Sequence, residues 1–203
     1  SVGAEQSTFV GAASGAASKG KQNAFLGYGS GESAQGNRNT FSGFQTGALA
    51  AGNLNVAGGA YAAAQSTGSN NVSQGSAAGA VVTGDQNVSI GYRAGTQVTL
   101  DADGNPTVPT ASTFSNAANV GSNTRALAND AVALGAGAQA SKVGGVALGA
   151  GSVASTASGV TGYDQSPGAT YAGIKTYGEG KLDHVGFTST IAASIPPAAS
   201  NGN

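Results

Sequence analysis

The chain has 203 residues, of which 35 are glycine, and its 8 Lys and Arg nearly balance its 9 Asp and Glu, giving a net charge of −1. With so little net charge, neither nucleic acid nor an anionic membrane surface has an electrostatic reason to bind it. The absence of cysteine excludes disulfides, thiolate catalysis and zinc–thiolate sites, and no apolar run approaches the ~18 residues of a membrane-spanning helix.

Residues 7–95 carry a 16-residue repeat marked by columns of glycine and asparagine. Long helices are not expected there, because each glycine in a helix interior costs about 1 kcal/mol. Short strands with Gly and Asn at the corners predict a β-solenoid with one coil per repeat, since both residues tolerate left-handed backbone angles. Strands are expected at 24–27 and 88–92. Stacked asparagines can form side-chain ladders, and the asparagine column consists of Asn23, Asn39, Asn55, Asn71 and Asn87.

Residues 96–113 interrupt the repeat. QVTL and TVPT flank DADGNP, a pattern that predicts a β-hairpin projecting from one coil. Insertions in solenoids often form the binding face, so Asp101, Asp103 and Asn105 are candidate ligand contacts. The same three residues copy the first ligand positions of a calcium loop. Pro106 replaces its glycine and Ser112 its bidentate glutamate, so a plain turn is favoured and no metal site is expected.

From Val120 the period becomes 14. The strand Val-Ala-Leu should place Val and Leu on one face and Ala on the other. Nine coils are expected, six of 16 residues and three of 14, in a rod on the order of 40 Å long. Such a coil buries little apolar surface by itself, so a cyclic homo-oligomer is expected, either dimer or trimer. The residues predicted to form the repeat and its oligomer core are Val132, Leu134, Gly135, Val146, Leu148 and Gly149.

DAVALG at 130–135 and GGVALGAGS at 144–152 resemble the head repeat of trimeric autotransporter adhesins of the YadA type. The resemblance covers about residues 7–155 apart from the insert. It implies a left-handed parallel β-roll and a homotrimeric head, displayed on the Gram-negative outer membrane without itself inserting into it. Such a head binds host extracellular matrix or a cell-surface receptor, or mediates autoaggregation.

The chain is accordingly divided into a head of residues 1–155 and a C-terminal cap or transition module of residues 156–203, with strands expected at about 170–177 and 182–190. The chain contains no methionine, so we expect it to be a segment excised from a longer open reading frame. Whether the module is complete is left open.

Catalytic residues are not identifiable. His184 is the single histidine and lies beside Asp183, but no nucleophile accompanies them, so neither an enzyme nor a cofactor is expected. The alternatives are a structural spacer or phage-fibre-like trimer, a left-handed β-helix acyltransferase, and an ice- or surface-binding solenoid. Aromatic residues cluster in the early coils and are expected either to pack internally or to form an exposed ligand surface. They are Phe9, Phe25, Phe41, Phe44, Tyr28 and Tyr61.

Overall fold

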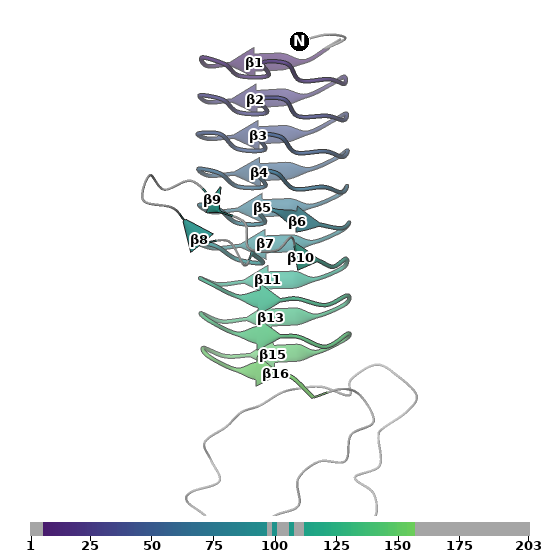
Figure 1. Cartoon of the computed structure of the whole chain (residues 1–203), viewed down its shortest axis with the longest axis vertical. Helices are drawn as coiled ribbons and strands as arrows, with labels where there is room; N and C mark the ends of the chain where they lie inside the picture. The colour runs from purple at the N-terminus through teal and green to yellow at the C-terminus, as the bar shows by residue number, and fades with distance from the viewer. Residues whose placement is uncertain (1–5, 97–98, 101–105, 108–111, 157–203) are drawn as a thin grey trace, which may run out of the picture.

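The computed structural model describes residues 6–96, 99–100, 106–107 and 112–156. This part of the chain is all-β and forms a solenoid in which every coil contributes one strand to a parallel sheet (Figure 1). The predicted β-solenoid is therefore confirmed. Among the described residues no helix is long and apolar enough to cross a membrane.

The main sheet has nine strands, which gives eight full turns of the chain between the first strand and the last. In spatial order they are β1 (Thr8–Val10), β2 (Ala24–Leu26), β3 (Thr40–Ser42), β4 (Val56–Gly58), β5 (Val72–Gln74), β7 (Val88–Ile90), β11 (Ala118–Val120), β13 (Val132–Leu134) and β15 (Val146–Leu148). The strands expected at 24–27 and 88–92 are present but shorter, because Gly27 and Gly91 turn the chain with φ of 127° and 126°.

Three smaller sheets complete the described strands. The three C-terminal coils have a second parallel sheet of β12 (Arg125–Ala126), β14 (Gln139–Ala140) and β16 (Val153–Ala154). Strand β6 (Val82–Thr83) pairs in parallel with β10 (Ser112–Thr113), so the wall of the solenoid continues across the insertion. Strands β8 (Thr99–Leu100) and β9 (Pro106–Thr107) pair antiparallel.

The central residue of each main-sheet strand points into the solenoid. Ala133 and Ala147 are buried, whereas Leu134 and Leu148 are exposed on the outer face. The predicted separation of Val and Leu from Ala is thus correct. The registers Val132↔Val146 and Leu134↔Leu148 continue that separation from coil to coil.

The interior changes character along the axis. Phe9, Phe25 and Phe41 form a stack with ring centroids 5.1 Å apart. A Cβ atom added to Gly15 would lie only 2.7 Å from the Phe9 ring, so this glycine column makes room for the rings. In the coil after the stack Ala57 replaces phenylalanine, and Ala63 replaces the glycine of that column. The smaller side chain at position 57 is offset by the added methyl group at position 63, so the interior stays filled.

The asparagine column forms a buried hydrogen-bonded ladder. The main-chain N–H of Asn55 donates to Oδ1 of Asn39 (3.0 Å), and the N–H of Asn71 donates to Oδ1 of Asn55 (3.0 Å). The Asn55 amide Nδ2 also donates to the Gly68 carbonyl in the next coil (2.9 Å). Each side chain therefore satisfies main-chain groups that the sheets leave unpaired.

The change of period from 16 to 14 removes two left-handed residues from each coil. A 16-residue coil has four residues with φ near +60°, for example Gly29, Gly31, Ser33 and Arg38, whereas the last 14-residue coil of the series has only Gly137 and Gly144 before β15. The segment that is lost is a turn, and the short strands β12, β14 and β16 replace it. The shorter coils thereby gain a second continuous sheet.

Several predicted features lie outside the described residues. They include the turn of the predicted hairpin with Asp101, Asp103 and Asn105, the strands expected at 170–177 and 182–190, and the pair Asp183 and His184. Strands β8 and β9 pair antiparallel, and the predicted hairpin over residues 96–113 stays a prediction.

Candidate binding surfaces

The outer face of the main sheet is apolar and uncharged. Its outward positions in the nine strands are occupied by Val, Leu, Ile, Ala, Gly and Thr, with one Ser and one Gln. Val10 is 53% exposed and Leu134 46%, although both lie in sheet positions that usually favour burial. From β7 to β15 every outward position is Val, Ile, Ala or Leu, and contiguous exposed apolar surface marks an interaction site. Four of the six predicted core residues, Val132, Leu134, Val146 and Leu148, lie on this face, and Gly135 and Gly149 form its corners.

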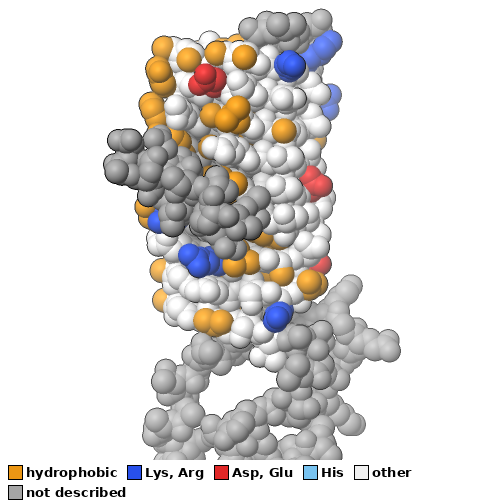
Figure 2. Space-filling model, viewed as in Figure 1, with side chains coloured by type: hydrophobic (Ala, Val, Ile, Leu, Met, Phe, Trp, Pro, Cys, Tyr) orange, Lys and Arg blue, Asp and Glu red, His pale blue; other side chains and the backbone are white. Residues whose placement is uncertain are grey.

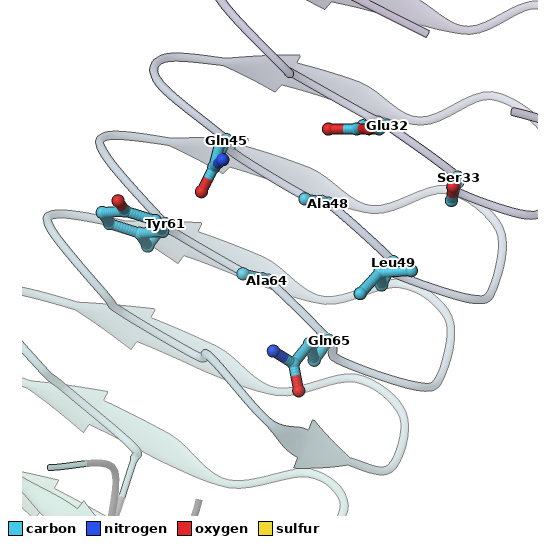
Figure 3. A pocket seen from close by; sticks show the side chains of 8 residues that line it. All are labelled: Glu32, Ser33, Gln45, Ala48, Leu49, Tyr61, Ala64 and Gln65. Carbon is cyan, nitrogen blue, oxygen red and sulfur yellow. The ribbon is translucent and has the colours of Figure 1, made fainter. Parts of the chain in front are cut away.

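A groove opens on a different wall, where successive coils turn through left-handed residues. Its volume is about 280 Å³. It spans three coils and is lined by Glu32, Ser33, Gln45, Ala48, Leu49, Tyr61, Ala64 and Gln65. Figure 3 shows Gln45 and Tyr61 at one end and Leu49 and Gln65 at the other, with the short side chains of Ala48 and Ala64 between them.

An exposed row of aromatic rings borders this groove. Tyr28 stacks on Phe44 at a centroid distance of 5.4 Å, and Phe44 meets Tyr61 edge to face at 5.4 Å. The early aromatic residues therefore divide into an internal and an exposed group. Phe25 and Phe41 pack inside the coils, while Tyr28 and Phe44 lie on the surface.

The main-chain N–H groups of the groove are already committed to neighbouring coils. The N–H of Gln45 donates to the Tyr28 carbonyl (2.8 Å), and the N–H of Leu49 donates to that of Glu32 (2.8 Å). The N–H of Tyr61 donates to the Phe44 carbonyl (2.9 Å). The main-chain N–H groups of Gln45, Leu49 and Tyr61 therefore do not serve as donors to a ligand, and the donors of the groove are its side chains.

Charge is sparse at both surfaces. Glu32 is the one ionisable acid or base among the lining residues apart from the phenol of Tyr61. Charged side chains are few and scattered over the face drawn in Figure 2. No group of three or more His, Asp or Glu that could hold a metal ion occurs within residues 6–96 and 112–156.

Sequence reasoning missed the groove. Its floor depends on Ala48 and Ala64, one period apart, and its walls on Leu49 and Gln65 in the adjacent column. The signal that could have found it is the column of left-handed positions, occupied by Ser33, Leu49 and Gln65 with φ of 55° to 58°. Serine, leucine and glutamine rarely adopt a positive φ, so the sequence does not predict a left-handed column at these positions.

The insertion leaves the solenoid from the same wall as the groove. Thr96 is the last described residue before it in the coil wall, and Thr96 follows Glu32, Ala48 and Ala64 in the same 16-residue column. Its hydroxyl donates to the Ala80 carbonyl of the coil before it (2.9 Å). This wall thus holds the groove and the point from which the insertion starts.

Comparison of the chain with protein-family models and with curated proteins gives no match.

Proposed function

We propose that this chain is the head of a trimeric bacterial surface adhesin. The observation that carries the proposal is the uncharged apolar outer face of the main sheet, which a solitary solenoid leaves in contact with water. A threefold axis parallel to the solenoid would bury this face in three identical interfaces. The repeat resemblance at 130–135 and 144–152 supports three chains over two, and a left-handed roll.

The proposed activity is attachment, with no catalytic step. The head would be exposed at the Gram-negative cell surface and would bind host extracellular matrix protein or a cell-surface receptor, or another head in autoaggregation. Three copies of any weak contact would act together and raise the overall avidity. The insert with Asp101, Asp103 and Asn105 stays a predicted contact region.

The mass of the purified chain in solution tests the assembly, and we expect three chains. Replacing Leu134 by arginine places a charge on the outer sheet face and is expected to lower the association constant at least ~100-fold, because an uncompensated buried charge costs about 3–5 kcal/mol. Light scattering across a dilution series measures this change.

Val143 provides the matched control for that substitution. It is 66% exposed and lies in the turn between β14 and β15 of the same coil, outside the strands of the main sheet. The Val143→Arg variant is expected to keep the parent mass. A monomeric parent chain, or equal dissociation of the two variants, would contradict the proposed trimer.

Attachment itself is measured with beads coated with the purified head and added to cultured host cells or immobilised matrix proteins. Beads carrying the parent head are expected to attach. Soluble parent head should compete with these beads more strongly than soluble Leu134→Arg, because dissociation in solution removes the avidity of three linked contacts. Absence of attachment by the parent trimer would leave only a spacer role for the solenoid.

A further inference from the structure

The groove bordered by Tyr28, Phe44 and Tyr61 combines three features that rarely occur together on a scaffold surface. It has aromatic rings on successive coils, with Tyr28 and Phe44 in register and the half-buried Tyr61 one position further along, a floor of small side chains, and amide and carboxyl groups at its rim. Figure 3 shows that the polar groups of Gln45, Gln65 and Glu32 come from three coils and surround a shared hollow. Pockets with an apolar lining and a few convergent polar groups are the usual form of a ligand site.

We infer that this groove binds a neutral saccharide chain. The C–H faces of a pyranose ring pack on aromatic faces, whose π clouds carry partial negative charge. Tyr28 and Phe44 stack on each other, so the ring offered inside the groove is Tyr61, which meets Phe44 edge to face. The amides of Gln45 and Gln65 each offer both donors and acceptors, and the Glu32 carboxylate offers acceptors, which suits the hydroxyl groups of a sugar. The volume of about 280 Å³ holds a short part of such a chain, and the exposed rings of Tyr28 and Phe44 lie next to Tyr61 at the border of the groove.

The charge of the groove selects against anionic ligands. No lysine or arginine lines it, and its one carboxylate repels sulfate, phosphate and carboxylate groups. Sulfated or sialylated chains therefore fit less well than uncharged ones.

The main chain of the groove selects against an added peptide strand. Strand addition requires free N–H and C=O groups at an edge, but the N–H groups of Gln45, Leu49 and Gln65 all donate to the preceding coil. A proline-rich peptide could pack on the aromatic rings without such bonds. The amides of Gln45 and Gln65 at the rim can hydrogen-bond to hydroxyl groups, so a saccharide is favoured over a proline-rich peptide.

This inference rests on the proposed function, for which it names the class of ligand. The groove lies on the turn-bearing wall and not on the strands of the main sheet, so burial of that sheet face in a trimer leaves the groove open. Three grooves per head would act together on a polymeric saccharide.

A tryptophan reporter makes the test direct, because the chain contains no tryptophan. The Phe44→Trp variant keeps an aromatic ring in the exposed row and supplies a single emission signal. The probes are the neutral hexasaccharides of β-1,4-linked glucose, β-1,4-linked N-acetylglucosamine and α-1,4-linked glucose, with a heparin hexasaccharide and a proline-rich decapeptide for comparison. We expect a saturable change in emission with at least one neutral hexasaccharide and none with heparin or the peptide.

Two further substitutions in the reporter chain locate the site. Tyr61→Ala and Gln45→Ala should each weaken binding of that saccharide about tenfold. The backbone tolerates both, because Ala13 and Ala77 occupy the same column with φ of 57° and 54°. The matched control is Tyr92→Ala, an exposed aromatic in the Tyr28 and Phe44 column that lines no part of the groove, and it should leave the affinity unchanged.

The inference is overturned if no neutral hexasaccharide alters the emission, if heparin or the peptide binds in its place, or if Tyr92→Ala weakens binding as much as Tyr61→Ala. The bead assay separates this failure from failure of the proposed function. Beads with Tyr61→Ala that attach to host cells as well as the parent would contradict saccharide binding as the route of attachment and leave adhesion standing. Saccharide binding by a head that attaches to nothing would contradict adhesion alone.

Discussion

Replacing Asn55 by alanine is expected to lower the free energy of unfolding by about 2–6 kcal/mol. The substitution removes the acceptor of the Asn71 N–H and the donor to the Gly68 carbonyl. Both main-chain groups then lie at part-buried positions without those partners, at a cost of about 1–3 kcal/mol each. Urea-induced unfolding followed by circular dichroism at fixed chain concentration measures the difference.

Asn53 is a matched control in the same coil. Its Oδ1 accepts the N–H of Asn37 (2.8 Å), but this bond belongs to an exposed ladder on the surface. Water can replace the lost acceptor, so Asn53→Ala should cost less than about 1 kcal/mol. Equal losses for the two alanine variants would show that burial of the inner ladder does not contribute to stability.

Extending the internal phenylalanine stack by one ring is expected to require two substitutions together. Ala57→Phe alone should destabilise the fold by about 1–3 kcal/mol, because the new ring would overlap the Cβ of Ala63. Adding Ala63→Gly reproduces the arrangement of Phe41 with Gly47 in the preceding coil. The double variant should regain the lost stability, and ring stacking adds about 0.5–1.5 kcal/mol.

A double-mutant cycle on the unfolding free energies measures this coupling. Ala63→Gly alone should be close to neutral, since glycine accepts the φ of 51° found at that position without a Cβ penalty. The expected interaction energy is therefore favourable and at least about 1 kcal/mol. Strictly additive effects would mean that the two positions do not share the same space.

The parts of the fold that could be predicted from sequence are those where one residue type is compulsory. Gly36 and Gly52 lie so close to the next coil that a side chain would collide with its main chain, so the glycine period is visible in the sequence. Asn39 and Asn55 are equally constrained by the inner ladder. The strand Val132–Leu134 could be predicted because its side chains alternate, with Val132 and Leu134 outward and Ala133 inward.

The parts of the fold that could not be predicted are those where hydrogen bonds to the neighbouring coil, and not the residue type, determine the backbone conformation. Leu49 and Val81 have φ of 58° and 59°, values that leucine and valine rarely adopt. Their N–H groups donate to the carbonyls of Glu32 and Ala64 in the preceding coils, and these bonds hold the backbone there. The groove depends on such positions, so its existence followed only from the stacked coils.

The inner asparagine ladder also governs how the molecule can change in length during evolution. From Asn23 to Asn87 each rung bonds to the rung 16 residues away, as Asn39 does to Asn23 and Asn55 to Asn39. Loss or duplication of one whole 16-residue unit rejoins identical rungs and changes the rod by one strand spacing, about 4.8 Å. A gain or loss of another length misaligns the asparagines with the carbonyls of the next coil unless the wall resumes in register, as it does across the insertion, where Asn87 Nδ2 still donates to the Phe114 carbonyl (2.9 Å). The height of the rod therefore changes in steps of whole coils, whereas an insertion lengthens the chain and leaves the height unchanged.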